Sequence, residues 1–233
     1  MSLIPSDNSQ VVAQNLRVIW VYEFHNTTEL GRVAAIVAAS KADGLMVKMV
    51  KSDWPHFSRW HDELAIKLPI GVSLTDVPND VAARSVPESV SMLWSAQPGV
   101  NYDKEVKIED VGSLAAARKL MNSKSQNSTF YVSVPQIVKH GDRGLVPEVV
   151  RAISISKVIP VISGTTKDAS PAHGRLVLCG AVSPTSRIAV SCSPYSADLR
   201  GLAMSGVTDF LLTIQPNMSA QEMSDFVSSV HNS

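Results

Sequence analysis

Short apolar runs alternate with longer amphipathic stretches along most of this chain. Residues 16–24 form the first run, LRVIWVYEF, which is rich in β-branched and aromatic residues. Such a run is typical of a strand buried on both faces of a parallel sheet. Thr27 or Thr28 then caps a predicted helix that ends at Gly44, and its apolar residues recur at helical spacing. A second apolar run at residues 45–50 completes a predicted strand–helix–strand unit.

The same alternation continues to the end of the chain. Eight apolar runs are predicted to be strands, and they begin at Leu16, Leu45, Ile70, Val100, Thr129, Val158, Ile188 and Val207. Helices are predicted between them, near residues 53–64, 85–97, 114–121, 147–153 and 196–204. The last helix starts with Ser219 and Glu222, which have the spacing of a capping box.

Two neighbouring segments carry weaker signals than the rest. The helix at residues 85–97 is predicted from a start signal at Ser85 and an apolar stripe that includes Leu93 and Trp94. The strand at residues 100–108 has three charged residues in its middle, Asp103, Lys104 and Glu105.

Strands that alternate with helices over the whole length predict an α/β protein with a parallel sheet. Eight such units favour a TIM-barrel-like (β/α)8 fold, and an open doubly wound parallel sheet is the alternative. We expect a polar N-terminal arm at residues 1–14 and a single barrel-like domain at residues 15–233. A ninth apolar run at residues 176–182 makes the region 165–190 irregular. Residues 176–192 are therefore either a hairpin or barrel strands.

The amino-acid composition limits the kinds of partner that the protein is expected to bind. The 21 basic and 21 acidic residues give a net charge of zero, which argues against nucleic acid and against an anionic membrane surface. No run is long enough to span a bilayer, and no secretory signal is seen. The expected location is cytoplasmic or virion-associated. The 2 cysteines lack the spacing of a zinc site, so we predict no metal and no cofactor.

The chain carries few charges for its size. Charged residues make up 18% of it, against about 25% in ordinary soluble domains. A surface with few charges and no net charge has little to keep copies apart. One interpretation is an ordinary serine-rich surface. The other is a homo-oligomer or a non-catalytic structural or recognition component of a larger assembly, such as a virion or phage tail.

Candidate chemistry lies where the predicted strands end, because the working face of a barrel is at the C-terminal ends of its strands. Glu23 follows the first strand, and Lys48 and Asp53 belong to the end of the second. Lys48 interrupts an otherwise apolar strand, so its ammonium must pair or reach water. We expect Glu23, Lys48 and Asp53 to meet at one opening. Tyr195, after the seventh strand, is a further candidate binding residue.

Residues 16–75 resemble the opening strands of glycoside-hydrolase-like TIM barrels. The matching features are VIWVYE at residues 18–23 and GLMVKMVKSD at residues 44–53, with a helix between them. The resemblance implies a small-molecule or sugar ligand in a cleft at the C-terminal ends of the strands. It also implies stacking of sugar rings on Trp54 and Trp60, although such residues also commonly pack helices.

A glycoside hydrolase needs two carboxyl groups that face one bond. Glu23 is the first candidate, and Glu105 or Asp103 is the second. The later predicted strands end without an acid, which departs from the family pattern. Whether the protein is an enzyme therefore stays open at this point.

Overall fold

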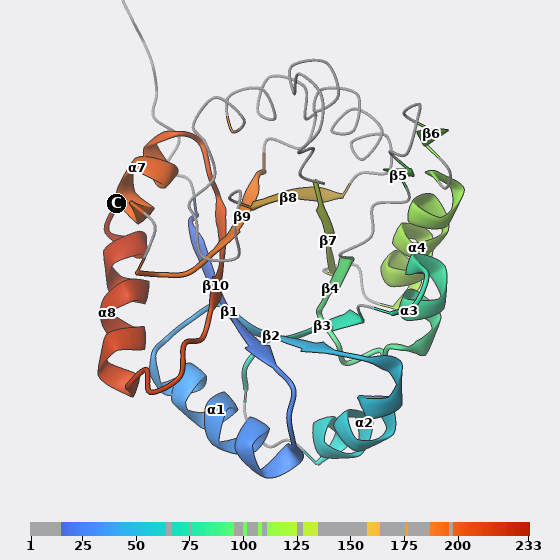
Figure 1. The fold of residues 1–233 in the computed structure, drawn as a ribbon, viewed down its shortest axis with the longest axis horizontal. Coiled ribbons are helices and arrows are strands. Elements are labelled where there is room, and N and C mark those ends of the chain that lie inside the picture. The colour runs from blue at the N-terminus through green and yellow to red at the C-terminus, as the bar shows by residue number, and fades with distance from the viewer. Residues whose placement is uncertain are drawn as a thin grey trace, which may run out of the picture.

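The computed structural model describes residues 15–63, 67–74, 76–95, 100–101, 107–108, 111–124, 128–134, 158–163, 176, 187–195 and 198–233. Within them, eight parallel strands close into a barrel in the order β1-β10-β9-β8-β7-β4-β3-β2 (Figure 1). These strands are β1 Arg17–Glu23, β2 Gly44–Met49, β3 Ile70–Leu74, β4 Met92–Ser95, β7 Thr129–Ser133, β8 Ile159–Ser163, β9 Ala189–Cys192 and β10 Asp209–Thr213. The predicted TIM-barrel-like fold is confirmed. The open sheet is excluded because β1 pairs with β10.

The described helices lie on the outside of the barrel, as Figure 1 shows. They are α1 Thr27–Ala39, the short 3-10 helix η1 Lys51–Asp53, α2 Trp54–Asp62, α3 Asn79–Ser85, α4 Val111–Lys124, α7 Leu199–Met204 and α8 Ala220–His231. The helix α8 packs against α1, α7 and β1, so the end of the chain lies beside its first strand.

The starts of two helices follow from capping chemistry. The Asn26 side chain caps α1 by accepting a hydrogen bond of 2.8 Å from the backbone N–H of Glu29. The expected caps, Thr27 or Thr28, are instead the first residues of the helix, so that prediction was wrong by one or two positions. The capping box of α8 is confirmed, because Ser219 and Glu222 bond to each other's backbone N–H.

The fourth barrel strand corrects two predictions. Residues 92–95 are β4, whereas the sequence analysis placed them in a helix. The described residues of the segment 100–108 form β5 Val100–Asn101 and β6 Lys107–Ile108, an antiparallel pair outside the barrel. The error has a physical reason: a four-residue apolar run is too short for its period to distinguish strand from helix.

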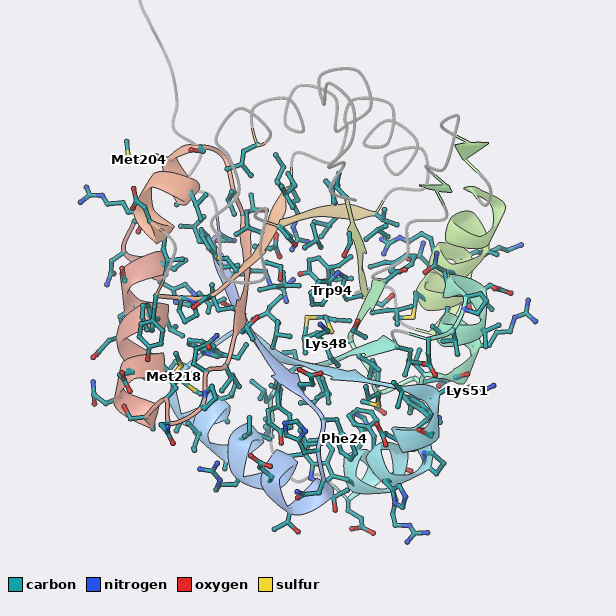
Figure 2. The ribbon with its side chains drawn as sticks, viewed as in Figure 1. Phe24, Lys48, Lys51, Trp94, Met204 and Met218 are labelled. Carbon is teal, nitrogen blue, oxygen red and sulfur yellow. The ribbon has the colours of Figure 1, made fainter. Side chains whose placement is uncertain are left out.

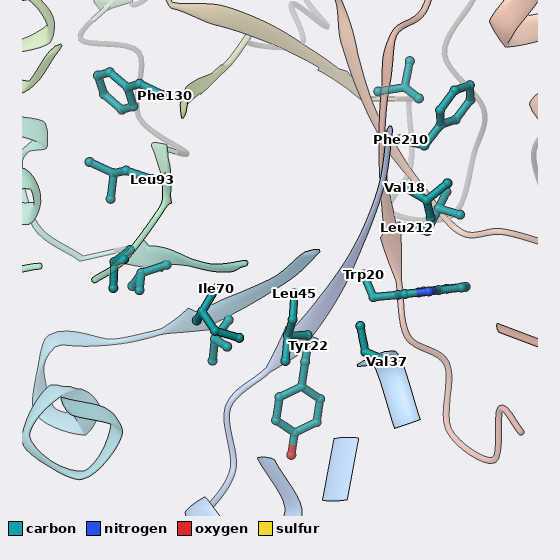
Figure 3. Packing of buried hydrophobic residues seen from close by; sticks show 14 of the residues in the cluster. Val18, Trp20, Tyr22, Val37, Leu45, Ile70, Leu93, Phe130, Phe210 and Leu212 are labelled. Atoms are coloured by element: carbon teal, nitrogen blue, oxygen red, sulfur yellow. The ribbon is translucent and has the colours of Figure 1, made fainter. Parts of the chain in front are cut away.

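Alternate residues of each strand build two separate apolar layers. One layer lies between the strands and the helices, and Figure 3 shows it around Trp20, Leu45 and Phe130. The other fills the barrel interior, and its members are Ile19, Val21, Met46, Met92, Trp94, Tyr131, Ile159, Val161, Ala189 and Leu211. Burial on both faces explains why the strands are nearly continuous apolar runs.

Glycine makes room for the two methionines of the interior. A Cβ placed on Gly71 would lie 2.8 Å from both Met46 Cε and Met92 Cβ. A Cβ on Gly44 would lie 2.6 Å from Met92 Cε. The side chains of Met46 and Met92 therefore occupy space that larger residues on β2 and β3 would take.

Several predictions lie outside the described residues. They are the polar arm at residues 1–14, the helix near residues 147–153 and the apolar run at residues 176–182, of which only the buried, helical Leu176 is described. The barrel closes through direct pairing of β8 with β9, without a strand from that run.

Candidate functional site

The inward-facing residues at the C-terminal ends of the barrel strands form one layer, which we call the mouth layer. Strand register brings them to the same level, because Glu23 pairs with Lys48, Lys48 with Ser73, and Ser163 with Ser191. The layer consists of Glu23, Lys48, Ser73, Trp94, Ser133, Ser163, Ser191 and Thr213. It combines one amine, one carboxylate, one indole and five hydroxyls.

Lys48 is the cation of the mouth layer. Its half-buried side chain places the ammonium nitrogen 5.6 Å from the centroid of the Trp94 ring. Figure 2 shows both residues inside the ring of strands. A cation above an indole face is stabilised by about 0.5–2 kcal/mol, depending on how far it is desolvated. The ring contact thus holds the ammonium within the barrel.

The Ser73 hydroxyl lies beside Lys48 and lacks a partner. Ser73 is completely buried, and its Oγ makes no hydrogen bond in the structure. A buried hydroxyl without a hydrogen bond costs about 1–3 kcal/mol. Across the neighbouring strands, Trp94 Nε1 donates a hydrogen bond of 3.0 Å to Ser133 Oγ, which fixes the indole plane. The Ser73 hydroxyl can therefore form a hydrogen bond with a ligand that binds at this layer.

Glu23 and Lys48 lie side by side on adjacent strands, as the sequence analysis expected. Their Cα atoms are partners in the β1–β2 register, and the Glu23 side chain is exposed at the opening. The ion pairs between described side chains include neither residue. The carboxylate and the amine are thus both available to a ligand.

The other expected binding residues occupy different surroundings. Asp53 ends η1 at the same end of the barrel, in the loop that follows β2. Trp54 begins α2 and packs on Phe57, with ring centroids 5.5 Å apart. Trp60 packs on Phe57 from the other side at 5.7 Å. Both indoles contribute to helix packing, which is the alternative that the sequence analysis left open for them.

Tyr195 is an exposed residue that contacts α8. Its hydroxyl donates a hydrogen bond of 3.0 Å to the Glu222 carboxylate, and its ring meets Phe226 edge to face. The phenol therefore braces the β9 loop against α8. Glu105 and Asp103 lie outside the described residues, and β4 ends at Ser95, so neither directly follows a barrel strand.

Sequence reasoning missed part of the mouth layer. Trp94 was placed in a helix, and Ser73 was not singled out. The available signal was alternation within β3, where Gly71 and Ser73 are the two small residues on one face of IGVSL. Serine also closes β4, β7 and β8, a recurrence that is visible once the strand ends are known.

A cavity of about 880 Å³ adjoins the mouth layer beside β1 and β10. It reaches the layer through Glu23 and Thr213 and extends between α1 and the loop that leads to α8. Its buried polar group is the hydroxyl of Tyr22, whose pKa is raised to about 12, mainly by burial and then by the Glu29 carboxylate. The opposite end of the barrel has no such opening among the described residues, because Arg17, Tyr131 and Asp209 fill it.

The described residues contain no cluster of three or more His, Cys, Asp or Glu side chains that could hold a metal ion. No helix in the described ranges has the length and apolarity needed to cross a membrane.

Comparisons with known proteins support the TIM-barrel fold and do not identify a reaction. No family model matches the chain, and no curated protein matches it by sequence. The native KDPGal structure is similar over 93% of both chains, with a TM-score of 0.58 and 13% identity. Phospho-2-dehydro-3-deoxyheptonate aldolase (DAHP synthase) from Thermotoga maritima matches 94% of this chain and 68% of its own, with a TM-score of 0.61 and 9% identity.

A third similar structure is a cube-shaped protein cage designed by fusing symmetric oligomeric domains. It covers 92% of this chain and 70% of its own, with a TM-score of 0.58 and 11% identity. At these identities the comparisons show the TIM-barrel fold alone. None of these three structures is described as a glycoside hydrolase, so the resemblance noted in the sequence holds at the level of the barrel.

Proposed function

We propose that this protein is a lyase of the aldolase type that binds a small polyhydroxylated carbonyl compound at the mouth of the barrel. In this proposal Lys48 is the reacting group and forms an imine with the carbonyl carbon of the substrate. The observation that carries the proposal is the placement of Lys48 inside the mouth layer, above Trp94 and beside the unpartnered Ser73 hydroxyl.

The hydroxyl groups of the mouth layer suit a substrate of the carbohydrate class. Ser133, Ser163, Ser191 and Thr213 are half-buried on the inner face, and each hydroxyl both donates and accepts hydrogen bonds. A polyol offers the same pairing, so it can bond to these hydroxyls and to the buried Ser73 hydroxyl when it binds. The barrel neighbour described as an aldolase is consistent with this substrate class.

The surroundings of Lys48 suit the formation of an imine by its amine. The neutral amine adds to the carbonyl carbon, water leaves, and the nitrogen ends as a protonated imine. The imine accepts the electrons of the substrate's Cα–Cβ bond, so that this bond breaks, an enamine forms on Lys48, and the Cβ carbon leaves as an aldehyde once its hydroxyl has lost a proton to Glu23. Return of that proton to Cα and hydrolysis of the imine release the second product and restore the amine. The Trp94 ring faces a cation both before and after this change, so its attraction is kept. Glu23, on the adjacent strand, is the group proposed to take the ammonium proton and return it to the departing water.

Hydrolysis of a glycosidic bond is the alternative suggested by the sequence resemblance. That reaction needs two carboxyl groups about 5–9.5 Å apart. Glu23 is the one carboxylate that the described residues contribute to the mouth layer. The amine mechanism needs one carboxylate and is therefore the better match.

Reductive trapping tests the proposal. The protein is incubated with dihydroxyacetone or pyruvate and sodium cyanoborohydride, which reduces an imine to a stable secondary amine. Peptide mass mapping is expected to locate the adduct at Lys48. Lys51, exposed and three residues further along, provides a matched control. Lys51→Met should label as the parent protein does, whereas Lys48→Met should lose the adduct.

Two outcomes would overturn the proposal. One is labelling of Lys51 and other surface lysines to the same extent as Lys48. The other is no adduct with either ketone, at protein concentrations where folding is verified by circular dichroism. A non-catalytic role in a larger assembly would give that second result together with a high mass in light scattering.

A further inference from the structure

The cavity beside the mouth layer has features that the proposed imine chemistry does not use. It is bounded by β1, by the inner side of α1 and by the segment from β10 to α8, and its volume is about 880 Å³. Ligand pockets for small molecules span about 300–1,000 Å³, so this one can hold more than a single small sugar. Its shared residues with the mouth layer, Glu23 and Thr213, make the two spaces continuous.

Tyr22 presents a buried hydroxyl to this cavity. The residue is 6% exposed, and its hydroxyl makes no hydrogen bond of normal length and angle. Figure 3 shows the ring on the outer side of β1, with the hydroxyl pointing away from the barrel. Burial, followed by the charge of the Glu29 carboxylate and its hydrogen bonding to the phenol, raises the pKa of Tyr22 to about 12 and keeps it protonated. The cavity therefore contains a neutral donor beside a carboxylate, and a ligand hydroxyl that binds there can bond to both groups.

The cavity is lined by groups of both charges, with one carboxylate in excess. Glu23 and Glu29 are acidic, whereas Arg32 is basic and His25 is a further nitrogen base. The carboxylates oppose an anionic ligand, and the guanidinium opposes a cationic one. Carboxylate, guanidinium and the amides of Gln215 and Asn217 together offer both donors and acceptors to a neutral molecule with many hydroxyls.

One wall of the cavity is apolar. Val33 and Ile36 contribute it from α1, and Met218 and Met223 from the opposite side. A sugar ring has an apolar face of axial C–H groups and a rim of hydroxyls. Such a ring would bury its face against these side chains while its rim reaches Tyr22, Glu29 and Arg32.

We propose that this cavity is a distal subsite for a neutral sugar ring, so that the ligand is a glycoside of two or more units. This inference rests on the proposed function for the reacting end of the ligand and extends it to a second ring. The first unit occupies the mouth layer, and the second passes Glu23 and Thr213 into the cavity.

Binding is measured on the Lys48→Met protein, which cannot form an imine, by backbone amide NMR shifts. The probes are methyl β-glucopyranoside, cellobiose and maltose, with inorganic phosphate as the anionic comparison. We expect a disaccharide to shift the amides of residues 22, 29–36 and 213–218. Tyr22→Phe should weaken this binding roughly fivefold to tenfold, the value of one hydrogen bond.

The matched control is Tyr131→Phe, since the Tyr131 hydroxyl lies at the other end of the barrel and is hydrogen-bonded to Asp209. It should lower the melting temperature and leave sugar binding unchanged. Tyr22→Phe should keep or raise the melting temperature while binding falls, a combination that a purely structural hydroxyl would not give.

The inference fails if none of the three sugars shifts these amides at millimolar concentration, or if phosphate shifts them more strongly than any sugar. Because the measurement uses Lys48→Met, it is independent of the trapping experiment. Trapping at Lys48 without sugar binding removes only the distal subsite. Sugar binding without trapping removes only the imine mechanism.

Discussion

The Tyr131 hydroxyl donates a hydrogen bond of 2.8 Å to the carboxylate of Asp209, which is completely buried inside the barrel. The two residues come from β7 and β10, which two other strands separate, so the bond crosses the barrel interior. Arg187 forms an ion pair with the same carboxylate, and Arg17 lies 3.9 Å from it. Burial, followed by the charge of Asp209, raises the pKa of Tyr131. These groups hold the N-terminal end of the barrel together.

Asp209→Asn is expected to lower the free energy of unfolding by about 3 kcal/mol, because it removes the charge that two arginines face in a buried setting. Urea unfolding followed by circular dichroism measures the change. Tyr131→Phe, which keeps the ion pair, should cost about 1–2 kcal/mol. If Asp209→Asn costs no more than Tyr131→Phe, the ion pair does not stabilise the barrel as described.

Gly71→Ala should destabilise the protein by about 1–3 kcal/mol through overpacking, because the new methyl group would lie 2.8 Å from Met46 Cε and from Met92 Cβ. Gly31→Ala is the matched control within α1, where the nearest atom to the new methyl group, Trp60 Nε1, is 3.6 Å away. It should stabilise the helix by roughly 0.5–1 kcal/mol. Thermal unfolding of the two variants tests the pair, and shifts of the same sign would contradict the packing description.

Ser73→Ala should leave the free energy of unfolding unchanged or raise it by up to about 1 kcal/mol, since the hydroxyl that is removed has no partner. Ser95→Ala provides the contrast, because the buried Ser95 hydroxyl is hydrogen-bonded to Asn79. That variant should lose about 1–2 kcal/mol. Equal losses in chemical denaturation would show that Ser73 is satisfied in solution.

Stability should fall at alkaline pH because of Cys192. Burial raises the pKa of its thiol from 9.0 to about 12, so above pH 9 the unfolded chain releases a proton that the folded chain keeps. The contribution is complete below pH 9 and is lost as the pH rises toward 12, with a slope of about 1.4 kcal/mol per pH unit.

Urea unfolding at pH 8, 9 and 10 measures this slope. Tyr22 and Tyr131, whose pKa values are also raised, begin to titrate in the unfolded chain over the same range and contribute equally in the parent and the variant. Cys192→Ala should reduce the dependence between pH 9 and 10. Since Cys179 is present in both proteins, the difference isolates Cys192. An unchanged slope in the variant would contradict the assignment.

The barrel could be predicted from the sequence because seven of its eight strands are apolar runs flanked by helix signals. The exception is β4, whose four residues Met92–Ser95 carry no readable period. The charged segment at residues 100–108 was predicted as a barrel strand instead, although its described residues pair as β5 and β6 outside the barrel. The number eight was therefore right while one of its members was misplaced.

The candidate site was predictable only in part. Glu23 and Lys48 were expected to meet because polar residues at strand ends of a parallel sheet share one edge, and the register places them side by side. Which faces of the strands turn inward depends on closure, and closure depends on contacts distant in sequence. Ser73 and Trp94 could therefore be recognised only after Gly71 and Met92 had fixed the inward face.

The N-terminal end of the barrel is filled by the groups around Asp209, so among the described residues access to the interior lies at the mouth layer. Under the proposed function, substrate and product would use this same route. Accumulated product would then slow turnover by blocking entry, in proportion to how tightly it is retained there.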